Sequence, residues 1–397
     1  FVPSRGLGDV YKRQVHALME MTFQSGPLPM TRKAIEGVLA IWPLPPDAEY
    51  ARLVWGLGIL SSVIGSEEGA IDRFEEGLRL CAQIGPESRW VEARLRHSIG
   101  YVLARLHRFE ESEAHLTVGL ALTEDAPRRW LSLRARLLGG MGNLYRRSDR
   151  ARQALPLYQE SVRIRREHGP QVGVEIQLNN LALAHRALGE HDEARRCLTE
   201  ALTLAREHRA MRTEATILNN LANGEDDIEQ SLGWYQQAYD LAIRTGGMRE
   251  KVTTLHNLST TLRLKGDLSE AHSQNSEALT LVEESGQRSF LANLIVNRAH
   301  LLFLREPPDV ARPKITRWLD ELPEAASSQR GGLRILLSQL STTADEEEEH
   351  LQRAVALLQG GRDHRSHAEA QLRLWAARAQ HRAAEEPPPA LPDRLSR

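Results

Sequence analysis

The sequence predicts an all-α fold, an α-solenoid of roughly 8–9 stacked helical hairpins. Three observations support this prediction. Apolar residues recur at three- and four-residue spacing along most of the 397-residue chain, which is the period of one helix face. The same pattern of leucine, small residue and turn residue returns about every 40 residues. Aromatic residues make up only 5% of the chain, which fits helices that pack closely through small side chains.

The clearest hairpin spans residues 178–204. One face of its first helix carries residues at i, i+3, i+4 and i+7: Leu178, Leu181, Ala182 and His185. Gly189 then interrupts the helix and suits a turn that needs backbone freedom. The second helix has the same spacing at Ala194, Leu198, Ala201 and Leu202. Neither helix can bury its apolar stripe alone, so each hairpin must stack on a neighbour.

The same columns recur along the chain. The small position of the first helix recurs at steps of 42, 42, 40, 40, 37 and 40 residues. It holds Gly58, Gly100, Gly142, Ala182, Ala222, Ser259 and Ala299. The turn position holds Gly65, Gly189 and Gly266 and, less ideally, His107 and Asp149. The small position of the second helix holds Ala70, Ser112, Ala154, Ala194, Ser231, Ala271 and Ala311.

These columns resemble the tetratricopeptide repeat, with its leucine–small pair, turn glycine and second-helix alanines. The resemblance covers residues 28–358 and is strongest over residues 51–285. This chain departs from the family pattern in two ways. Its period exceeds the usual ~34 residues. The family's proline near the repeat end is mostly absent, although Pro86, Pro127 and Pro170 lie near that place. Long-period repeats of this kind resemble those of kinesin light chains and of bacterial signalling ATPases and transcription regulators. The resemblance implies a right-handed superhelix with a concave binding surface.

We divide the chain into five segments. Residues 1–14 resemble translated adapter sequence and are interpreted as a non-native scar, which leaves open whether an upstream domain is missing. Residues 15–46 are predicted as a partial N-terminal repeat, and residues 47–286 as the core array. Residues 287–384 read as degenerate repeats with a capping helix, because prolines and Trp318 replace the usual residues there. Residues 385–397, rich in proline, are predicted to be disordered.

One repeat departs from the pattern. Ala222 and Ser231 are nine residues apart, whereas Ala182 and Ala194 are twelve apart. We therefore predict a shortened first helix, a second helix capped by Asp226 or Asp227, and a local change in superhelix angle.

Neither a metal nor a cofactor is predicted. The acidic run at residues 345–349 is interpreted as a helix N-terminus whose charges complement the helix dipole. His364 and His367 are expected to be solvated. Cys81 and Cys197 lack metal spacing and are expected to be reduced packing residues. Neither a phosphate-binding glycine loop nor a recognisable catalytic set is present, so an enzyme is not expected.

Net charge is −2, so the chain has no overall basic footprint for nucleic acid. No apolar run approaches the ~20 residues that a membrane-spanning helix needs, and no secretory signal pattern is present. We therefore expect a cytoplasmic protein with neither a nucleic-acid nor a membrane partner; its oligomeric state is not predicted.

One polar column is a candidate binding site. The residue before the core position is asparagine in four consecutive repeats, at steps of 40, 37 and 40 residues: Asn180, Asn220, Asn257 and Asn297. An amide both donates and accepts, so it can pair with the backbone of an extended peptide. Six residues later a partial arginine column, which could bind acidic side chains, comprises Arg146, Arg186 and Arg263. The alternative is that the asparagines bond to the neighbouring hairpin and stabilise stacking.

The leading hypothesis is therefore a protein-interaction scaffold that binds an extended peptide or a partner helix, of acidic character, in its concave groove. The alternative is the C-terminal sensor arm of a larger bacterial signalling ATPase, kinase or transcription regulator whose effector domain is missing. A peptide-pheromone receptor is disfavoured because residues 15–41 are too short for an N-terminal bundle. The lysine pair by which chaperone-binding members of the family hold a terminal carboxylate is not evident.

Overall fold

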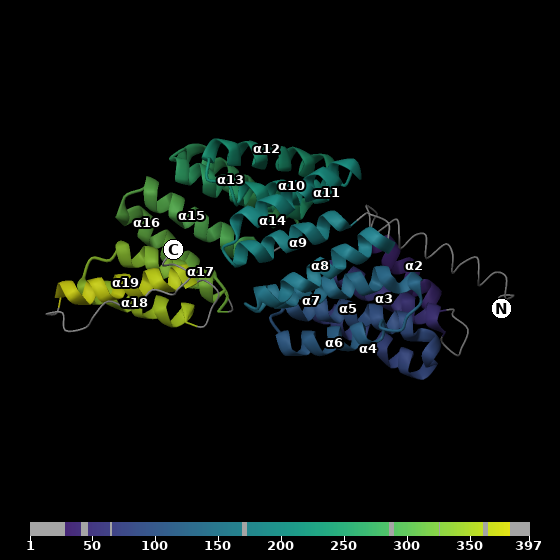
Figure 1. The fold of residues 1–397 in the computed structure, drawn as a ribbon. Coiled ribbons are helices and arrows are strands. Elements are labelled where there is room, and N and C mark those ends of the chain that lie inside the picture. The colour runs from purple at the N-terminus through teal and green to yellow at the C-terminus, as the bar shows by residue number, and fades with distance from the viewer. Residues whose placement is uncertain are drawn as a thin grey trace. The chain divides into compact units, whose positions relative to one another are not determined.

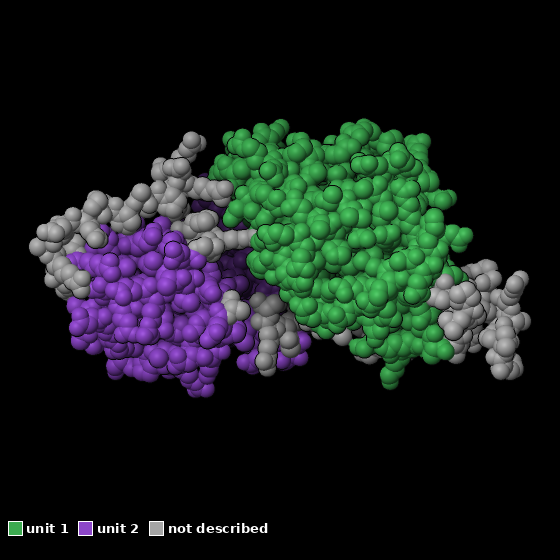
Figure 2. All heavy atoms as spheres, turned by 90° about the horizontal axis from the view of Figure 1, so that it is seen from below, with its two compact units in different colours: residues 1–213 green, residues 214–397 purple. Residues whose placement is uncertain are grey.

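The computed structural model describes residues 28–40, 47–63, 66–168, 173–285, 290–324, 326–359 and 364–381. Within these residues the regular structure is helical, without a strand (Figure 1). The predicted all-α fold is thus confirmed. The chain forms two compact units, Phe1–Thr213 and Glu214–Arg397 (Figure 2). The boundary lies inside the range predicted as one core array.

Unit 1 consists of antiparallel hairpins in chain order. A single helix precedes them, α2 (Leu28–Ala40). Four hairpins follow: α3 (Ala48–Val63) with α4 (Glu67–Ile84), α5 (Arg89–Arg105) with α6 (Phe109–Ala121), α7 (Leu131–Arg147) with α8 (Ala151–His168), and α9 (Val174–Ala187) with α10 (His191–Glu207). Short 3-10 turns lead into α5 and α7, at Pro86–Ser88 and Arg128–Trp130.

Unit 2 also consists of hairpins in chain order. The boundary between the units falls within α11 (Met211–Ala222), which is the first helix of its first hairpin. Its hairpins are α11 with α12 (Ile228–Thr245), α13 (Met248–Lys265) with α14 (Leu268–Ser285), α15 (Leu291–Arg305) with α16 (Pro308–Glu321), and α17 (Ser327–Gln339) with α18 (Ala344–Leu358). One further helix, α19 (His364–His381), packs on α17 and α18, as the predicted capping helix should. Eight hairpins of described helices agree with the expected repeat number.

The turn between the two helices of a hairpin has the same backbone form in four repeats. Gly189 and Gly266 have positive φ angles of 79° and 99°, and at the aligned positions the non-glycine residues His107 and Asp149 have φ of 62° and 59°. Side chains disfavour this left-handed region. The column alignment therefore identified the strained turn residues correctly, including the two that are not glycine.

Small residues let the paired helices approach each other. A methyl group added at Gly100 would lie 2.6 Å from Leu116 Cγ, and one at Gly142 would lie 2.7 Å from Tyr158 Cε1. Leu116 and Tyr158 are fully buried. The bulky second-helix position thus fills the space that the small first-helix position leaves, as the repeat pattern predicts.

The shortened repeat is confirmed. Helix α11 ends at Ala222, and α12 begins after Asp227, whose carboxylate accepts hydrogen bonds from the backbone N–H of Glu229 (2.9 Å) and Gln230 (3.2 Å). Asp227 is therefore the cap, rather than Asp226. The predicted change in superhelix angle stays a prediction.

The degenerate repeats are helical too. Pro308 begins α16 and Pro313 lies within it. The acidic run at residues 345–349 occupies the first turns of α18, where Thr343 caps the helix, as predicted. The predicted scar, the predicted C-terminal tail, residues 15–27, residues 41–46 and Gly65 lie outside the described residues. Pro29, expected in a turn, lies in the first turn of α2, where proline is tolerated.

Candidate functional site

The predicted groove residues are divided between the two units. Arg146 of α7 and both Asn180 and Arg186 of α9 belong to unit 1. Unit 2 contains the remaining four, which lie on α11, α13 and α15: Asn220, Asn257, Arg263 and Asn297. Every one of them lies on a first helix, as the alignment requires. We describe each unit's set separately.

In unit 2, Asn297 joins two neighbouring hairpins. Its side chain is buried, with 4% of the residue exposed. The amide Nδ2 donates to Ser259 Oγ (2.8 Å), and Oδ1 accepts from Arg263 Nε (3.2 Å). Both partners lie on α13 whereas Asn297 lies on α15. Asn297 therefore stabilises stacking, and it also fixes the direction of the Arg263 guanidinium.

The neighbouring asparagine shares this role in part. Half-buried Asn257 approaches the Asn219 Oδ1 atom with its Nδ2 at 3.4 Å. Asn219 is buried and donates to Thr254 Oγ1 at 2.7 Å. The polar ladder therefore runs from α11 through α13 to α15. Asn219, which precedes the predicted column by one residue, was not predicted; its buried position depends on packing between hairpins, which spacing alone does not reveal.

Arg263 is the cation among the four predicted residues of unit 2. It is half-buried on α13, and no acidic side chain pairs with it among the described residues. Loss of hydration lowers its pKa. Two histidines beside it are kept neutral: burial and then the charge of Arg263 lower the pKa of His300 to about 4, and the same causes lower that of His256. Burial and the charge of Arg263 thus dominate here, although the charge of Glu369 acts in the opposite direction on His300.

An apolar surface adjoins this cation. Leu264 and Leu304 are 69% and 51% exposed, which is unusual for large aliphatic side chains. Each follows its asparagine, Asn257 or Asn297, by seven residues, and residues seven apart share one helix face. The candidate site in unit 2 therefore combines a fixed guanidinium with exposed leucines. Sequence patterns did not single out these leucines, because an isolated apolar residue on a helix usually belongs to the core.

The predicted residues of unit 1 share an intermediate degree of burial. Asn180, Arg146 and Arg186 are all half-buried. Arg146 Nε is buried without a hydrogen-bond partner among the described residues. Its charge opposes the effect of burial on Tyr158, whose pKa is raised to about 12. In unit 2, by comparison, Arg263 and Asn297 are joined directly by a hydrogen bond.

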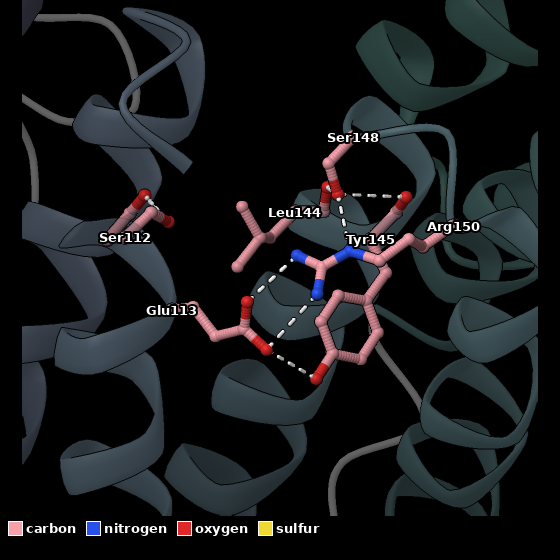
Figure 3. A network of polar contacts seen from close by, with 7 residues as sticks. Ser112, Glu113, Leu144, Tyr145, Ser148 and Arg150 are labelled. Carbon is pink, nitrogen blue, oxygen red and sulfur yellow. Dashed lines mark hydrogen bonds and ion pairs between the residues drawn. The ribbon is translucent and has the colours of Figure 1, made fainter. Parts of the chain in front are cut away.

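A different polar cluster in unit 1 is fully paired. Glu113 of α6 accepts from both terminal nitrogens of Arg150 (3.3 and 2.9 Å) and from Tyr145 Oη (2.9 Å), while Arg150 Nε donates to Ser148 Oγ at 3.0 Å (Figure 3). The Arg150 guanidinium also stacks on the Tyr145 ring. Pairing with Arg150 lowers the pKa of Glu113. This cluster joins one hairpin to the next and leaves no charge for a ligand, in contrast to Arg263.

Comparison with known proteins agrees with this geometry. Residues 133–207 and 213–284 match the tetratricopeptide repeat family. Tetratricopeptide repeat protein 23 of Bos taurus is 28% identical over 116 residues, which are 27% of this chain and 26% of that protein. The chain therefore spans about a quarter of the length of this curated relative. The two matched stretches are tetratricopeptide repeats.

Solved structures show the same fold. A Rap protein complexed with competence and sporulation factor has a TM-score of 0.59 at 13% identity, over 94% of this chain and 98% of that one. The apo quorum sensor NprR from B. thuringiensis has a TM-score of 0.58 at 16% identity, over 85% and 95%. A STAND protein with a tetratricopeptide repeat sensor from Pyrococcus horikoshii has a TM-score of 0.56 at 12% identity, over 96% and 54%. At these identities the likeness is one of fold.

None of the helices in the described part of the chain has the length and apolarity required to cross a bilayer.

Proposed function

We propose that the chain binds an extended protein segment of acidic character through the exposed faces of its first helices. The observation that carries this proposal is Arg263, a half-buried guanidinium without an acidic partner among the described residues. Holding an unpaired cation out of water costs free energy. A ligand carboxylate would offset that cost through a charge-assisted hydrogen bond.

The asparagines then divide into two roles. Asn297 holds Arg263 in place and links the hairpins. Half-buried Asn180, Asn220 and Asn257 remain the proposed contacts to peptide backbone, and Arg146 and Arg186 remain proposed contacts to acidic side chains. Leu264 and Leu304 add apolar surface beside the guanidinium. An acidic segment that also carries a large apolar residue fits this combination.

The direct test uses the full chain and two fluorescent twelve-residue peptides, one alternating Glu and Leu and the other alternating Gln and Leu. Arg263→Gln is compared with Arg317→Gln, which alters a 79% exposed arginine on α16 that pairs with Glu321 in its own helix. We expect the Glu peptide to bind at least about tenfold more weakly to Arg263→Gln, a change of ~1.4 kcal/mol, and equally to Arg317→Gln. Equal binding of both peptides to both variants would refute the proposal.

A second proposed function is a sensor arm. The STAND protein contains a tetratricopeptide repeat sensor, and the chain covers 54% of that protein, so a comparable chain can be part of a larger signalling protein. We propose that this chain, in the cytoplasm, could likewise report ligand binding to an effector domain. The test is to sequence the source DNA upstream of the Val15 codon. An open frame that continues into an ATPase, kinase or DNA-binding domain supports this function, and a nearby start codon contradicts it.

A further inference from the structure

Unit 1 carries an arginine column that the sequence patterns did not single out. Arg52, Arg94 and Arg136 lie on α3, α5 and α7 at steps of 42 residues, each five residues before the core position of its repeat. These three helices pack against each other in order, α3 on α5 and α5 on α7. Equivalent positions of stacked hairpins line up, so the three arginines form a row on one face of unit 1.

Aromatic rings hold the first part of this row in place. The Arg94 Cζ atom lies 3.9 Å from the centre of the Trp55 ring and 4.7 Å from that of Trp90, and Arg52 lies 5.5 Å from the Trp90 ring. Trp55 is itself fixed, because its Nε1 donates to Ser98 Oγ at 2.9 Å. Stacking on a ring orients a guanidinium without neutralising its charge. Ring stacking thus preorganises this part of the row, in which Arg52 also lies 3.9 Å from a Glu49 carboxylate oxygen.

A neutral histidine lies within the row. Burial and the charges of Arg136 and Arg94 lower the pKa of His97 to about 3, although a hydrogen bond with the Arg136 backbone acts in the opposite direction. His97 therefore carries no charge near pH 7. The absence of a side chain at Gly140 makes room for this ring, since an added methyl group there would lie 3.2 Å from His97 Cδ2.

The row ends at a poorly solvated arginine on α8. Arg165 Nε is buried and has no hydrogen-bond partner among the described residues. Loss of hydration and the charge of Arg136 both lower the pKa of Arg165. The charge of Glu175 acts in the opposite direction on Arg165. Both carboxylate oxygens of Glu175 already accept from the Gly173 backbone N–H, at 3.0 and 2.9 Å, and one lies 3.4 Å from His208 Nδ1.

Arg136 of α7 is the arginine of this row that a ligand would contact first. Its side chain is exposed, so a ligand can reach it, and the described residues provide it with neither a hydrogen bond nor an ion pair. An exposed guanidinium beside a poorly solvated one suits a planar or tetrahedral oxyanion. Arginine binds both carboxylate and phosphate oxygens through paired N–H groups.

We propose that the row from Arg94 through Arg136 to Arg165 is an anion-binding site of unit 1, which takes a carboxylate or phosphate group carried by a peptide. This site shares no residue with the Arg263 site of unit 2. It is a second recognition point, and it does not depend on the proposed function of the first.

The experiment uses the full chain and three fluorescent hexapeptides, made of glutamate, of phosphoserine with glycine, and of glutamine. Binding is measured by anisotropy for the wild type, Arg136→Gln, Arg136→Lys and Arg263→Gln. The control is Arg163→Gln, because Arg163 lies on α8 beside the site but is exposed and pairs with Glu160 and Glu167. Thermal melting of each variant confirms that it is folded, which is expected because Arg136 is exposed.

We expect the glutamine peptide not to bind, and at least one anionic peptide to bind at least about tenfold more weakly to Arg136→Gln than to the wild type or to Arg163→Gln. Arg136→Lys should recover only part of the loss. Stronger binding of the phosphoserine peptide would identify phosphate as the preferred group, and stronger binding of the glutamate peptide would identify carboxylate.

Failure of both anionic peptides to bind, or equal binding to Arg136→Gln, would overturn the proposal. If Arg263→Gln alone weakened binding, the unit 1 site would be refuted while the proposed function stood.

Discussion

At the scale of single residues, Asn297 shows how one side chain can serve both stacking and binding. Both ends of its amide are used, by Ser259 and Arg263 on the neighbouring hairpin. Asn180 occupies the same column in unit 1 but is half-buried. The column thus occupies equivalent positions of first helices, while the role of each member depends on the partner that the next hairpin provides.

This difference gives the first prediction. Asn297→Ala should lower the free energy of unfolding by ~1–3 kcal/mol, because it leaves buried groups on α13 without their partners. Asn180→Ala should change it by less than ~0.5 kcal/mol. Urea unfolding followed by circular dichroism measures both. If Asn180→Ala proved as destabilising as Asn297→Ala, the stacking role would extend to the whole column.

A second residue-scale prediction concerns pH. The pKa of His300 is lowered to about 4, whereas an unfolded histidine titrates near ~6.5. As pH falls below ~6.5 the unfolded chain takes up a proton that the folded chain does not, so stability decreases between about pH 6.5 and 4, by up to ~1.4 kcal/mol per pH unit. His300→Gln should flatten this slope. The unfolding free energy measured between pH 7 and 4.5 tests this, and an unchanged slope in the variant would contradict it.

At the scale of elements, the interrupted hairpin was predictable because its sequence signals are local. The short spacing from Ala222 to Ser231 predicted the early end of α11, and the aspartates predicted the cap. The sequence did not decide which aspartate caps α12, because this depends on the local backbone conformation. In the structure the cap is Asp227. Contacts between hairpins, such as those of Asn219 and Arg165, were not predictable. They depend on how ridges of one helix enter grooves of the next, which residue spacing does not specify.

The cap gives the third prediction. Asp227→Ala should cost ~1 kcal/mol, because the N–H groups of Glu229 and Gln230 lose their acceptor. Asp226→Ala removes the same charge one residue earlier without removing a cap, so it serves as the matched control and should stay within ~0.5 kcal/mol of the wild type. Chemical denaturation of both variants makes the comparison. Equal losses would indicate a charge effect rather than a capping effect.

At the scale of the whole molecule, the repeat pattern predicted one continuous core array, whereas the chain forms two compact units. The boundary falls in α11, the first helix that the sequence predicts to be shortened. A solenoid is held together by contacts between neighbouring repeats, so its cooperativity weakens where one interface is weak. Column spacing identifies repeats but contains little information about the strength of each interface, which is why the division was not predicted.

The division leads to the last prediction. Gly142→Ala in unit 1 would place a methyl group 2.7 Å from Tyr158 Cε1, and Gly331→Ala in unit 2 would place one 2.7 Å from Leu358 Cγ. Overpacking of this kind costs ~1–3 kcal/mol. Gly233→Ala in α12, where an added methyl group meets nothing within 4 Å, is the control and should stabilise by ~0.5–1 kcal/mol. If stability is held within each unit, hydrogen exchange should quicken mainly in residues 66–168 for Gly142→Ala and mainly in residues 290–359 for Gly331→Ala. Equal acceleration throughout the chain for either variant would mean that the two units unfold as one.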